Sequence, residues 1–304
     1  MNDIIPYSEV KWQTRDGLIC HASLFRPDGE DANKGQRPGS AKNIVCIPGL
    51  TRNGADFFDI ATLLASEGFT THALTLRGRG SSDRDTNYRN YHPAQYCDDV
   101  LKALDFFELE TAIFIGTSLG GITTMLLAEQ SGHRIEKAII NDVGPRLAPG
   151  GLERIGMMLA GSTGKTAGLS NEPTDKAFSQ ALATTKEYNQ QAFPNEDEEF
   201  WQCFVKRTYT EVADGQWIPN YDPNIVQSIA ELGPGPDLWP GFRALKSIPT
   251  LLIHGALSDL LTRDIVDEMT SVHPQLQTVT VNNVGHAPML TEPQAWKAIT
   301  KFIT

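Results

Sequence analysis

A single serine between two glycines has the setting in this chain that most clearly suggests chemistry. Residues 111–126 read TAIFIGTSLGGITTML: an apolar, β-branched run ends at Gly116, and Ser118 and Gly120 follow before a helical pattern begins. The G-x-S-x-G spacing between a strand and a helix is typical of a sharp, strained turn that exposes the serine oxygen. The glycines let strand and helix approach closely. We therefore predict that Ser118 is a nucleophile.

A serine hydroxyl needs a base within hydrogen-bonding reach, and the base needs an acid that orients it. His286 stands in VNNVGHAPML, directly after the last predicted strand, so its loop should lie at the same sheet edge as Ser118. His254, in LLIHG, also ends a strand but precedes a better candidate in the same loop. We predict His286 as the base. The other histidines are expected to be solvated or to lie in the core: His21, His72, His92, His133 and His273.

Two aspartates compete for the acid. Asp259 follows the predicted strand TLLIHG by one short loop, and Asp142 ends the predicted strand of IINDVGP. Either strand end could reach a histidine on a neighbouring loop, and both satisfy the chain order serine, acid, histidine. We favour Asp259 and assign Asp142 to the substrate pocket or to a structural role.

A tetrahedral oxyanion needs N–H donors that are already in place, and each is typically worth about 3–4 kcal/mol of transition-state stabilisation. The residue after the nucleophile, Leu119, supplies one backbone N–H. The loop after the strand NIVCIPG should supply the second, and we assign it to the backbone N–H of Leu50. Asn53 is expected to cap the following helix.

The segments around these residues alternate between strands and helices. Asp16-Gly17 predicts a hairpin between the first two strands. The alternation requires crossover connections and a mostly parallel sheet with helices on both faces. The expected strands are 8–14, 19–27, 43–49, 69–76, 112–117, 137–143, 248–255 and 276–283, and the expected helices are 54–68, 94–108, 119–130, 262–271 and 292–303.

The alternation is interrupted in the middle of the chain. Helical patterns occur at 150–160, 173–189 and 196–210 without a convincing buried strand, and residues 161–174 and 231–241 read as loops. We therefore predict one α/β domain formed by residues 1–145 and 237–304, interrupted by a helical insertion at 146–236.

Composition restricts the classes of partner. The 304 residues carry a formal net charge of −11, which repels phosphate backbones and argues against a nucleic-acid partner. No signal peptide and no apolar run of about 20 residues is evident. The four cysteines (Cys20, Cys46, Cys97 and Cys203) have no CxxC spacing and are expected to be free thiols. We expect a soluble cytoplasmic protein that needs no metal or cofactor; the oligomeric state stays open.

Taken together, these motifs resemble the α/β-hydrolase fold family, in particular its capped serine hydrolases: esterases, lactonases, cofactor-free haloperoxidases and carbon–carbon bond hydrolases. The matching pieces are IPGLTRNGADF, LTLRGRGSSD, GTSLGG, PTLLIHGALSDLLT and VGHAPML, in the family's order and over nearly the whole chain. Two positions depart from the common pattern. Pro48 replaces a frequent histidine, and Thr75 replaces an aspartate that often supports the Leu-Arg-Gly turn.

The resemblance implies that residues 146–236 form a lid over the cleft. Seven apolar lid residues could line the pocket, although we expect more than half of them to pack within the lid: Met157, Met158, Phe193, Phe200, Trp201, Phe204 and Trp217. We name Asp142, Met157 and Trp217 as pocket residues.

Three functions remain in competition. The favoured one is a serine hydrolase that cleaves carboxylic esters of small to medium apolar substrates through an acyl-enzyme. A second keeps the same residues but opens a lactone or cleaves a carbon–carbon bond. The third is a ligand-binding protein on a hydrolase scaffold. A dehalogenase or epoxide hydrolase of this fold would need Asp at position 118, where this chain has Ser.

Overall fold

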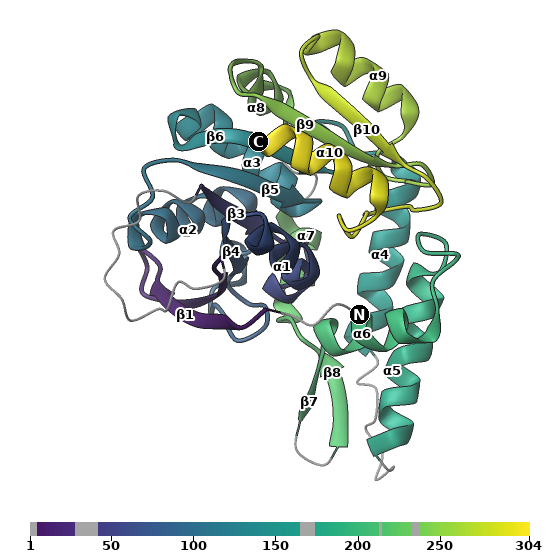
Figure 1. Ribbon diagram of the computed structural model, residues 1–304. Helices are drawn as coiled ribbons and strands as arrows, with labels where there is room; N and C mark the ends of the chain where they lie inside the picture. Colours follow the sequence, from purple (N-terminus) through teal and green to yellow (C-terminus); the bar gives the residue numbers. More distant parts are fainter. Residues whose placement is uncertain (1–4, 28–41, 165–173, 213–214, 233–236) are drawn as a thin grey trace.

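A computed structural model describes residues 5–27, 42–164, 174–212, 215–232 and 237–304 (Figure 1). At its centre is an eight-stranded sheet with the order β1-β2-β4-β3-β5-β6-β9-β10. β1 and β2, and β2 and β4, pair antiparallel, and every other neighbouring pair is parallel. The strands are β1 Tyr7–Gln13, β2 Ile19–Phe25, β3 Asn43–Ile47, β4 Thr70–Thr75, β5 Ala112–Thr117, β6 Ile135–Asn141, β9 Thr250–Gly255 and β10 Gln277–Val281.

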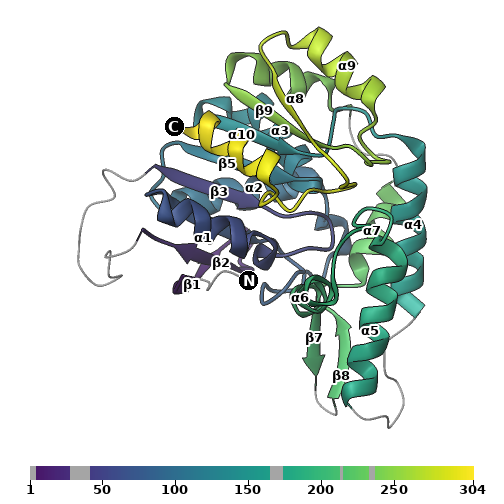
Figure 2. The same ribbon diagram turned by 45° about the vertical axis from the view of Figure 1, so that its right-hand side comes forward.

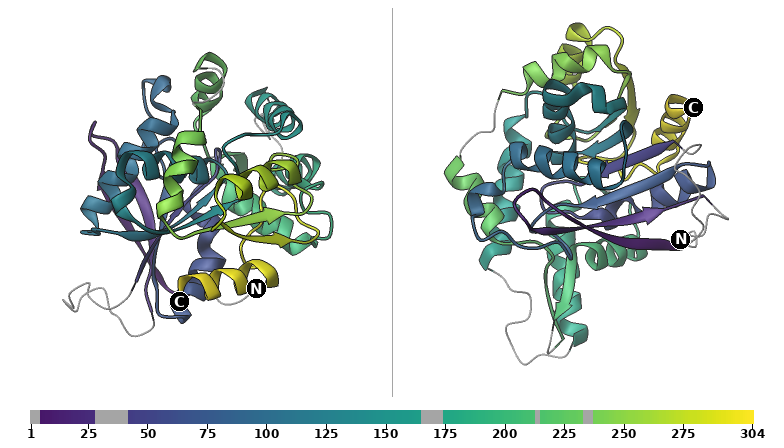
Figure 3. Two further views of the ribbon diagram at one scale, coloured as in Figure 1. Left: turned by 90° about the horizontal axis from the view of Figure 1, so that it is seen from above. Right: turned by 90° about the vertical axis from the view of Figure 1, so that its left-hand side faces the viewer.

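Helices cover both faces of this sheet, as the strand–helix alternation predicts. On one face, α1 (Phe58–Ser66) and α10 (Pro293–Ile303) pack with Phe57, Ile113 and Ile253 in one buried cluster. On the other face lie α2 (Pro93–Phe106), α3 (Leu119–Ser131), α8 (Trp239–Ala244) and α9 (Arg263–Val272), which contribute to a second cluster. The view from above in Figure 3 shows the yellow helix α10, at the C-terminus, and the yellow-green helix α9 on opposite sides of the sheet. The mostly parallel sheet between two helical layers is confirmed.

Between β6 and β9 the chain leaves this sheet. We call residues 149–232 the inserted segment; it lies along one side of the sheet, in teal and green in Figures 1 and 2. Its elements are α4 Pro149–Gly164, α5 Thr174–Asn189, α6 Glu198–Thr208, β7 Tyr209–Val212, β8 Gln216–Pro219 and α7 Asn224–Leu232.

The inserted segment differs from the sequence-based expectation in its strands and in the extent of its helices. β7 and β8 form an antiparallel pair that the sequence did not predict. Both strands are short and neither contains a buried residue, so they lack the apolar run that marks a strand of the central sheet.

The two loops predicted at 161–174 and 231–241 are partly helical. Residues 161–164 belong to α4, residue 174 begins α5, residues 231–232 end the unpredicted helix α7, and residues 239–241 begin α8. Residues 165–173 and 233–236 lie outside the described residues.

One buried arginine ties the N-terminal hairpin to the rest of the sheet. Arg77, after β4, has a fully buried side chain that donates hydrogen bonds to Asp16, Asp85 and Asp99 at 2.6–2.9 Å. Asp16 lies in the hairpin turn between β1 and β2, and Asp99 lies on α2. The hydrogen bonds from Arg77 lower the pKa of Asp16 to about 2. The Arg77 guanidinium therefore joins three segments of the chain through their carboxylates.

Candidate active site

Ser118 occupies a strained turn between β5 and α3. It is the N-cap residue of α3 and has φ 53° and ψ −113°, a conformation that non-glycine residues rarely adopt. Its N–H donates to the carbonyl of Asn141 at the end of the neighbouring strand β6. The predicted strand–turn–helix setting of the serine is therefore present.

The glycines beside Ser118 are required by close packing. A Cβ atom on Gly116 would lie 2.4 Å from the carbonyl oxygen of Gly120, and one on Gly120 would lie 1.9 Å from the carbonyl oxygen of Ile47. No side chain fits at either position. The start of α3 is thus pressed against the ends of β3 and β5, which fixes the direction of the serine side chain.

His286 joins this serine to an aspartate. Its Nε2 lies 2.9 Å from Ser118 Oγ, and its Nδ1 lies 2.9 Å from Asp142 Oδ2. An ionised carboxylate can only accept a hydrogen bond, so Nδ1 carries the proton and neutral Nε2 accepts the bond from the serine hydroxyl. This is the arrangement in which a histidine can take the hydroxyl proton as the oxygen attacks.

Several donors contact the Asp142 carboxylate. Its side chain is fully buried. Besides His286, the Gly255 N–H donates to Oδ1 at 2.7 Å and Ser258 Oγ donates to Oδ2 at 2.6 Å. These contacts fix the position of the carboxylate beside the imidazole.

The prediction that Asp259 orients His286 is wrong, because Asp259 pairs with an arginine and Asp142 contacts the imidazole. Arg154 of α4 donates to both carboxylate oxygens of Asp259, Nε at 2.5 Å and Nη2 at 2.8 Å. Burial raises the pKa of Asp259, but the hydrogen bonds and positive charge of Arg154 outweigh it, and the pKa lies below its ordinary value. Asp259 therefore joins the inserted segment to the loop after β9, and Asp142 takes the position beside the imidazole.

Two residues that the sequence did not single out support the arrangement. Asn141 Nδ2 donates to Thr117 Oγ1 at 3.0 Å and to the carbonyl of Pro288 at 2.8 Å, so it joins β5 to the loop that carries His286. Ser258 holds the Asp142 carboxylate. In the sequence, Asn141 precedes Asp142 and Ser258 precedes Asp259. Neither residue belongs to the G-x-S-x-G pattern, so no motif marked them.

The loop after β3 lies beside the serine. A Cβ atom on Gly49 would lie 3.8 Å from Ser118 Cβ. The buried side chain of Arg79 donates from Nε and Nη2 to the carbonyl of Leu50 at 2.9 and 2.7 Å, which fixes the loop. Leu119, the first residue of α3, brings its N–H to the same region, at the positive end of the helix. Asn53 caps the next helix by accepting from the Ala55 N–H, as predicted.

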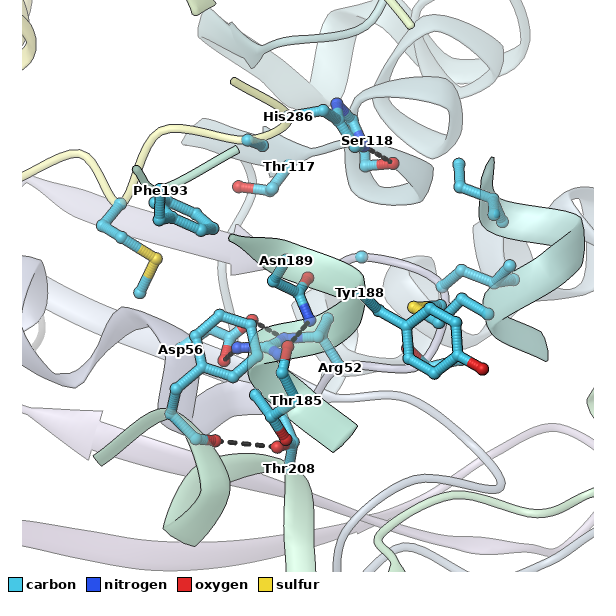
Figure 4. Close-up of a pocket in the computed structure, with 18 of the residues that line it drawn as sticks. Arg52, Asp56, Thr117, Ser118, Thr185, Tyr188, Asn189, Phe193, Thr208 and His286 are labelled. Carbon is cyan, nitrogen blue, oxygen red and sulfur yellow. Dashed lines mark hydrogen bonds and ion pairs between the residues drawn. The ribbon is translucent and has the colours of Figure 1, made fainter. Parts of the chain in front are cut away.

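A cavity of about 170 Å³ opens at Ser118 and His286. Figure 4 shows both residues at one end of the view, with Arg52, Asp56, Thr185 and Thr208 at the other. The sheet domain contributes residues 49–52, 56, 57, 117, 118 and 286–290, and the inserted segment contributes Arg154, Ile155, Met158, Thr184, Thr185, Tyr188, Asn189, Phe193, Phe204, Thr208, Tyr209, Pro219 and Tyr221.

The three residues that the sequence analysis predicted for the pocket, Asp142, Met157 and Trp217, do not line this cavity. Asp142 lies beneath His286, Met157 is 57% exposed, and the Trp217 ring packs on Phe178 with ring centroids 4.9 Å apart. Met158 lines the cavity in place of its neighbour, because one residue along a helix turns the side chain by about 100°. Of the seven apolar candidates, Met158, Phe193 and Phe204 reach the cavity.

The described residues contain neither a metal site nor a membrane-spanning helix. No group of three or more His, Cys, Asp or Glu side chains there could hold a metal ion. Within the same residues, none of the helices combines the length and apolarity needed to cross a bilayer.

Comparisons with known proteins identify the family. The sequence pattern of the alpha/beta hydrolase fold family matches residues 42–293. A 3-hydroxybutyrate-oligomer hydrolase from Cupriavidus necator is 31% identical over 276 residues, which cover 88% of this chain and 90% of the relative. The chain therefore belongs to the alpha/beta hydrolase fold family, and the predicted resemblance is confirmed.

Two further relatives agree with this assignment. A 2-(acetamidomethylene)succinate hydrolase from Mesorhizobium japonicum is 26% identical, with 87% of this chain and 89% of the relative covered. The crystal structure of an alpha/beta hydrolase from Novosphingobium aromaticivorans superposes with a TM-score of 0.83 at 33% identity, covering 98% of each chain. The chain is a hydrolase of this fold.

Proposed function

We propose that this protein is a serine hydrolase that cleaves carboxylic esters with Ser118, His286 and Asp142 as its catalytic triad. The observation that carries the proposal is the pair of 2.9 Å contacts that His286 makes with the serine oxygen and with a buried carboxylate. The relative from Cupriavidus necator is a 3-hydroxybutyrate-oligomer hydrolase, and this activity supports an ester substrate.

The reaction follows from these contacts. Ser118 Oγ attacks the ester carbonyl as His286 Nε2 takes its proton, and Asp142 stabilises the imidazolium that forms. The backbone N–H groups of Leu50 and Leu119 bind the oxyanion. Collapse of the tetrahedral intermediate breaks the ester bond, and His286 protonates the leaving alcohol. His286 then activates a water molecule, which attacks the acyl-enzyme and releases the acid and free Ser118.

The inserted segment acts as a cap in this proposal. It supplies about half of the cavity lining, including Met158, Phe193 and Phe204. Apolar walls next to the nucleophile exclude water from the acyl-enzyme until the alcohol has left. Hydrolysis of a lactone or of a carbon–carbon bond would use the same triad. The fold does not separate these reactions, because the reaction depends on the residues of the site.

A labelling and activity experiment tests the proposal. A fluorophosphonate probe should label the native protein and not Ser118→Ala, and Ser118→Ala should lose at least about 10³-fold in kcat on p-nitrophenyl esters. A protein that only binds ligands would not be labelled. Turnover of ring-fission dienoates or lactones without any ester turnover would contradict the ester assignment.

A further inference from the structure

We propose that Arg52 binds a free carboxylate of the substrate, so that the preferred esters are anionic ones, such as short oligoesters of hydroxy acids or half-esters of dicarboxylic acids. The inference rests on the proposed ester hydrolysis and adds the charge of the substrate and the residue that recognises it. Arg52 lines the cavity and lies two residues after Leu50, on the loop beside Ser118.

The Arg52 side chain is fixed before any ligand arrives. Its Nε and Nη2 donate to the two oxygens of Asp56 at 2.6 and 2.7 Å. Its Cζ lies 4.0 Å from the centroid of the Phe204 ring, which is within cation–π range. The exposed fractions of the two side chains are 17% for Arg52 and 15% for Asp56. A guanidinium held in this way loses little conformational entropy when it binds a ligand.

Asp56 uses two of the five N–H groups of Arg52. A guanidinium carries one N–H at Nε and two each at Nη1 and Nη2, so both Nη1 protons and one Nη2 proton remain. The Nη1–Nη2 edge matches the two oxygens of a carboxylate. Arg52 can therefore hold Asp56 on one edge and a substrate carboxylate on the other.

The Arg52 guanidinium favours an anion over a neutral group at its end of the cavity. The lining contains Arg52, Arg154 and Asp56; Arg52 is paired with Asp56 and Arg154 with Asp259, so the formal charges of the two pairs cancel. Limited exposure to water strengthens the attraction between the guanidinium and an anion. Arg52 has no role in the proposed acyl transfer itself, which uses only Ser118, His286, Asp142 and two backbone groups.

Polar side chains surround the same end of the cavity. Figure 4 shows Arg52 and Asp56 near Thr185 and Thr208, with Asn189 on the side toward Ser118 and Tyr188 to the right of Arg52. Asn189 Nδ2 donates to the Thr185 carbonyl at 2.8 Å, which orients the amide. A cavity with the nucleophile at one end and a guanidinium among hydroxyl groups at the other suits an ester with a carboxylate at its far end.

The test compares each anionic ester with its neutral analogue. The substrates are the linear dimer of 3-hydroxybutyrate and monoethyl glutarate, each beside the compound in which a primary amide replaces the free carboxylate. We expect the native protein to prefer the carboxylates by about 10- to 100-fold in kcat/KM, the range of a charge-assisted hydrogen-bonded pair.

The variants must not leave Asp56 as an unpaired carboxylate. Arg52→Gln is therefore combined with Asp56→Asn, and the preference should fall to near 1, mainly through a higher KM for the anionic esters. Arg52→Lys keeps the positive charge but cannot form a bidentate pair with a carboxylate. It should retain part of the preference for anionic esters. Arg207→Gln is the matched control: Arg207 pairs with Asp59 at 2.8 Å, between α6 and α1, outside the cavity lining. It should leave the preference unchanged.

Two results would overturn the inference while the proposed function stands: equal rates for carboxylate and amide substrates in the native protein, or a preference that survives in Arg52→Gln/Asp56→Asn. The absence of both ester hydrolysis and Ser118 labelling would instead overturn the proposed function, and the inference with it.

Discussion

Asp142 and Asp259 have the same side chain, and their surroundings alone separate them. Asp142 is buried and accepts from His286, Ser258 and the Gly255 N–H, whereas Asp259 is paired with Arg154. Only a carboxylate in contact with Nδ1 can hold the imidazole in the tautomer that accepts the serine proton. The proposed role of each aspartate can therefore be tested by the same conservative change.

We expect Asp142→Asn to lower kcat by about 10³- to 10⁴-fold, because the amide can favour the wrong tautomer of His286. Asp259→Asn should keep kcat within about 10-fold, since it removes an ion pair and no contact to the imidazole. Steady-state kinetics on one p-nitrophenyl ester would measure both. Equal losses in the two variants would argue against Asp142 as the acid.

At this scale, the serine and the histidine of the proposed triad could be singled out from the sequence, and the aspartate could not. Ser118 has a local pattern in the sequence, and His286 lies in the loop after the last strand. Asp142 directly follows β6 and Asp259 lies in the loop after β9, and these strands are neighbours in the sheet. Side-chain pairing then decides between them, and the partner Arg154 comes from a helix more than 100 residues away in sequence.

Among the elements, the contact between α3 and the end of β3 sets the direction of the serine. The strands of the sheet and the helices α1, α2, α3, α9 and α10 could be predicted to within a few residues, because their apolar patterns have clear periods. The short helix α8 could not, and its first residues were predicted as part of a loop. β7 and β8 could not, since half-exposed pairs of four residues carry no such pattern. The close approach at Gly120 depends on tertiary packing, which the G-x-S-x-G pattern indicates only indirectly.

Gly120→Ala should destabilise the fold by about 3 kcal/mol or more, because the new Cβ would lie 1.9 Å from the Ile47 carbonyl oxygen. Gly156→Ala is the matched control within a helix. No heavy atom lies within 4 Å of its Cβ position, and alanine is the better helix former, so stability should rise by up to about 1 kcal/mol. Urea denaturation measures both changes; a Gly120→Ala protein of native stability would contradict the packing argument.

For the molecule as a whole, Arg77 is the point where the hairpin turn, the segment after β4 and helix α2 are joined. Each of its partners comes from a different part of the chain: Asp16, Asp85 and Asp99. Removing a buried ion while its partners stay is costly, because the remaining charges have lost both water and their counter-ion.

We expect Arg77→Met to lower the free energy of unfolding by about 3–5 kcal/mol. Arg263→Met should change it by less than about 0.5 kcal/mol, since Arg263 and its partner Asp267 are more than 60% exposed. Chemical denaturation followed by circular dichroism would compare the two. Similar stabilities for both variants would show that burial adds nothing to the Arg77 contacts.

The turn after β4 has a second connection, through backbone atoms. The Gly80 N–H donates to the Asn220 carbonyl, and the Asp222 N–H donates to the Gly78 carbonyl. These two hydrogen bonds lie on either side of Arg79, whose side chain donates to the Leu50 carbonyl. The C-terminal part of the inserted segment is thereby anchored to the residue that fixes the loop beside the nucleophile. An exchange of the inserted segment between relatives therefore has to keep residues 220–222, together with Arg154 of α4 and Arg207 of α6, which pair with Asp259 and Asp59 of the sheet domain.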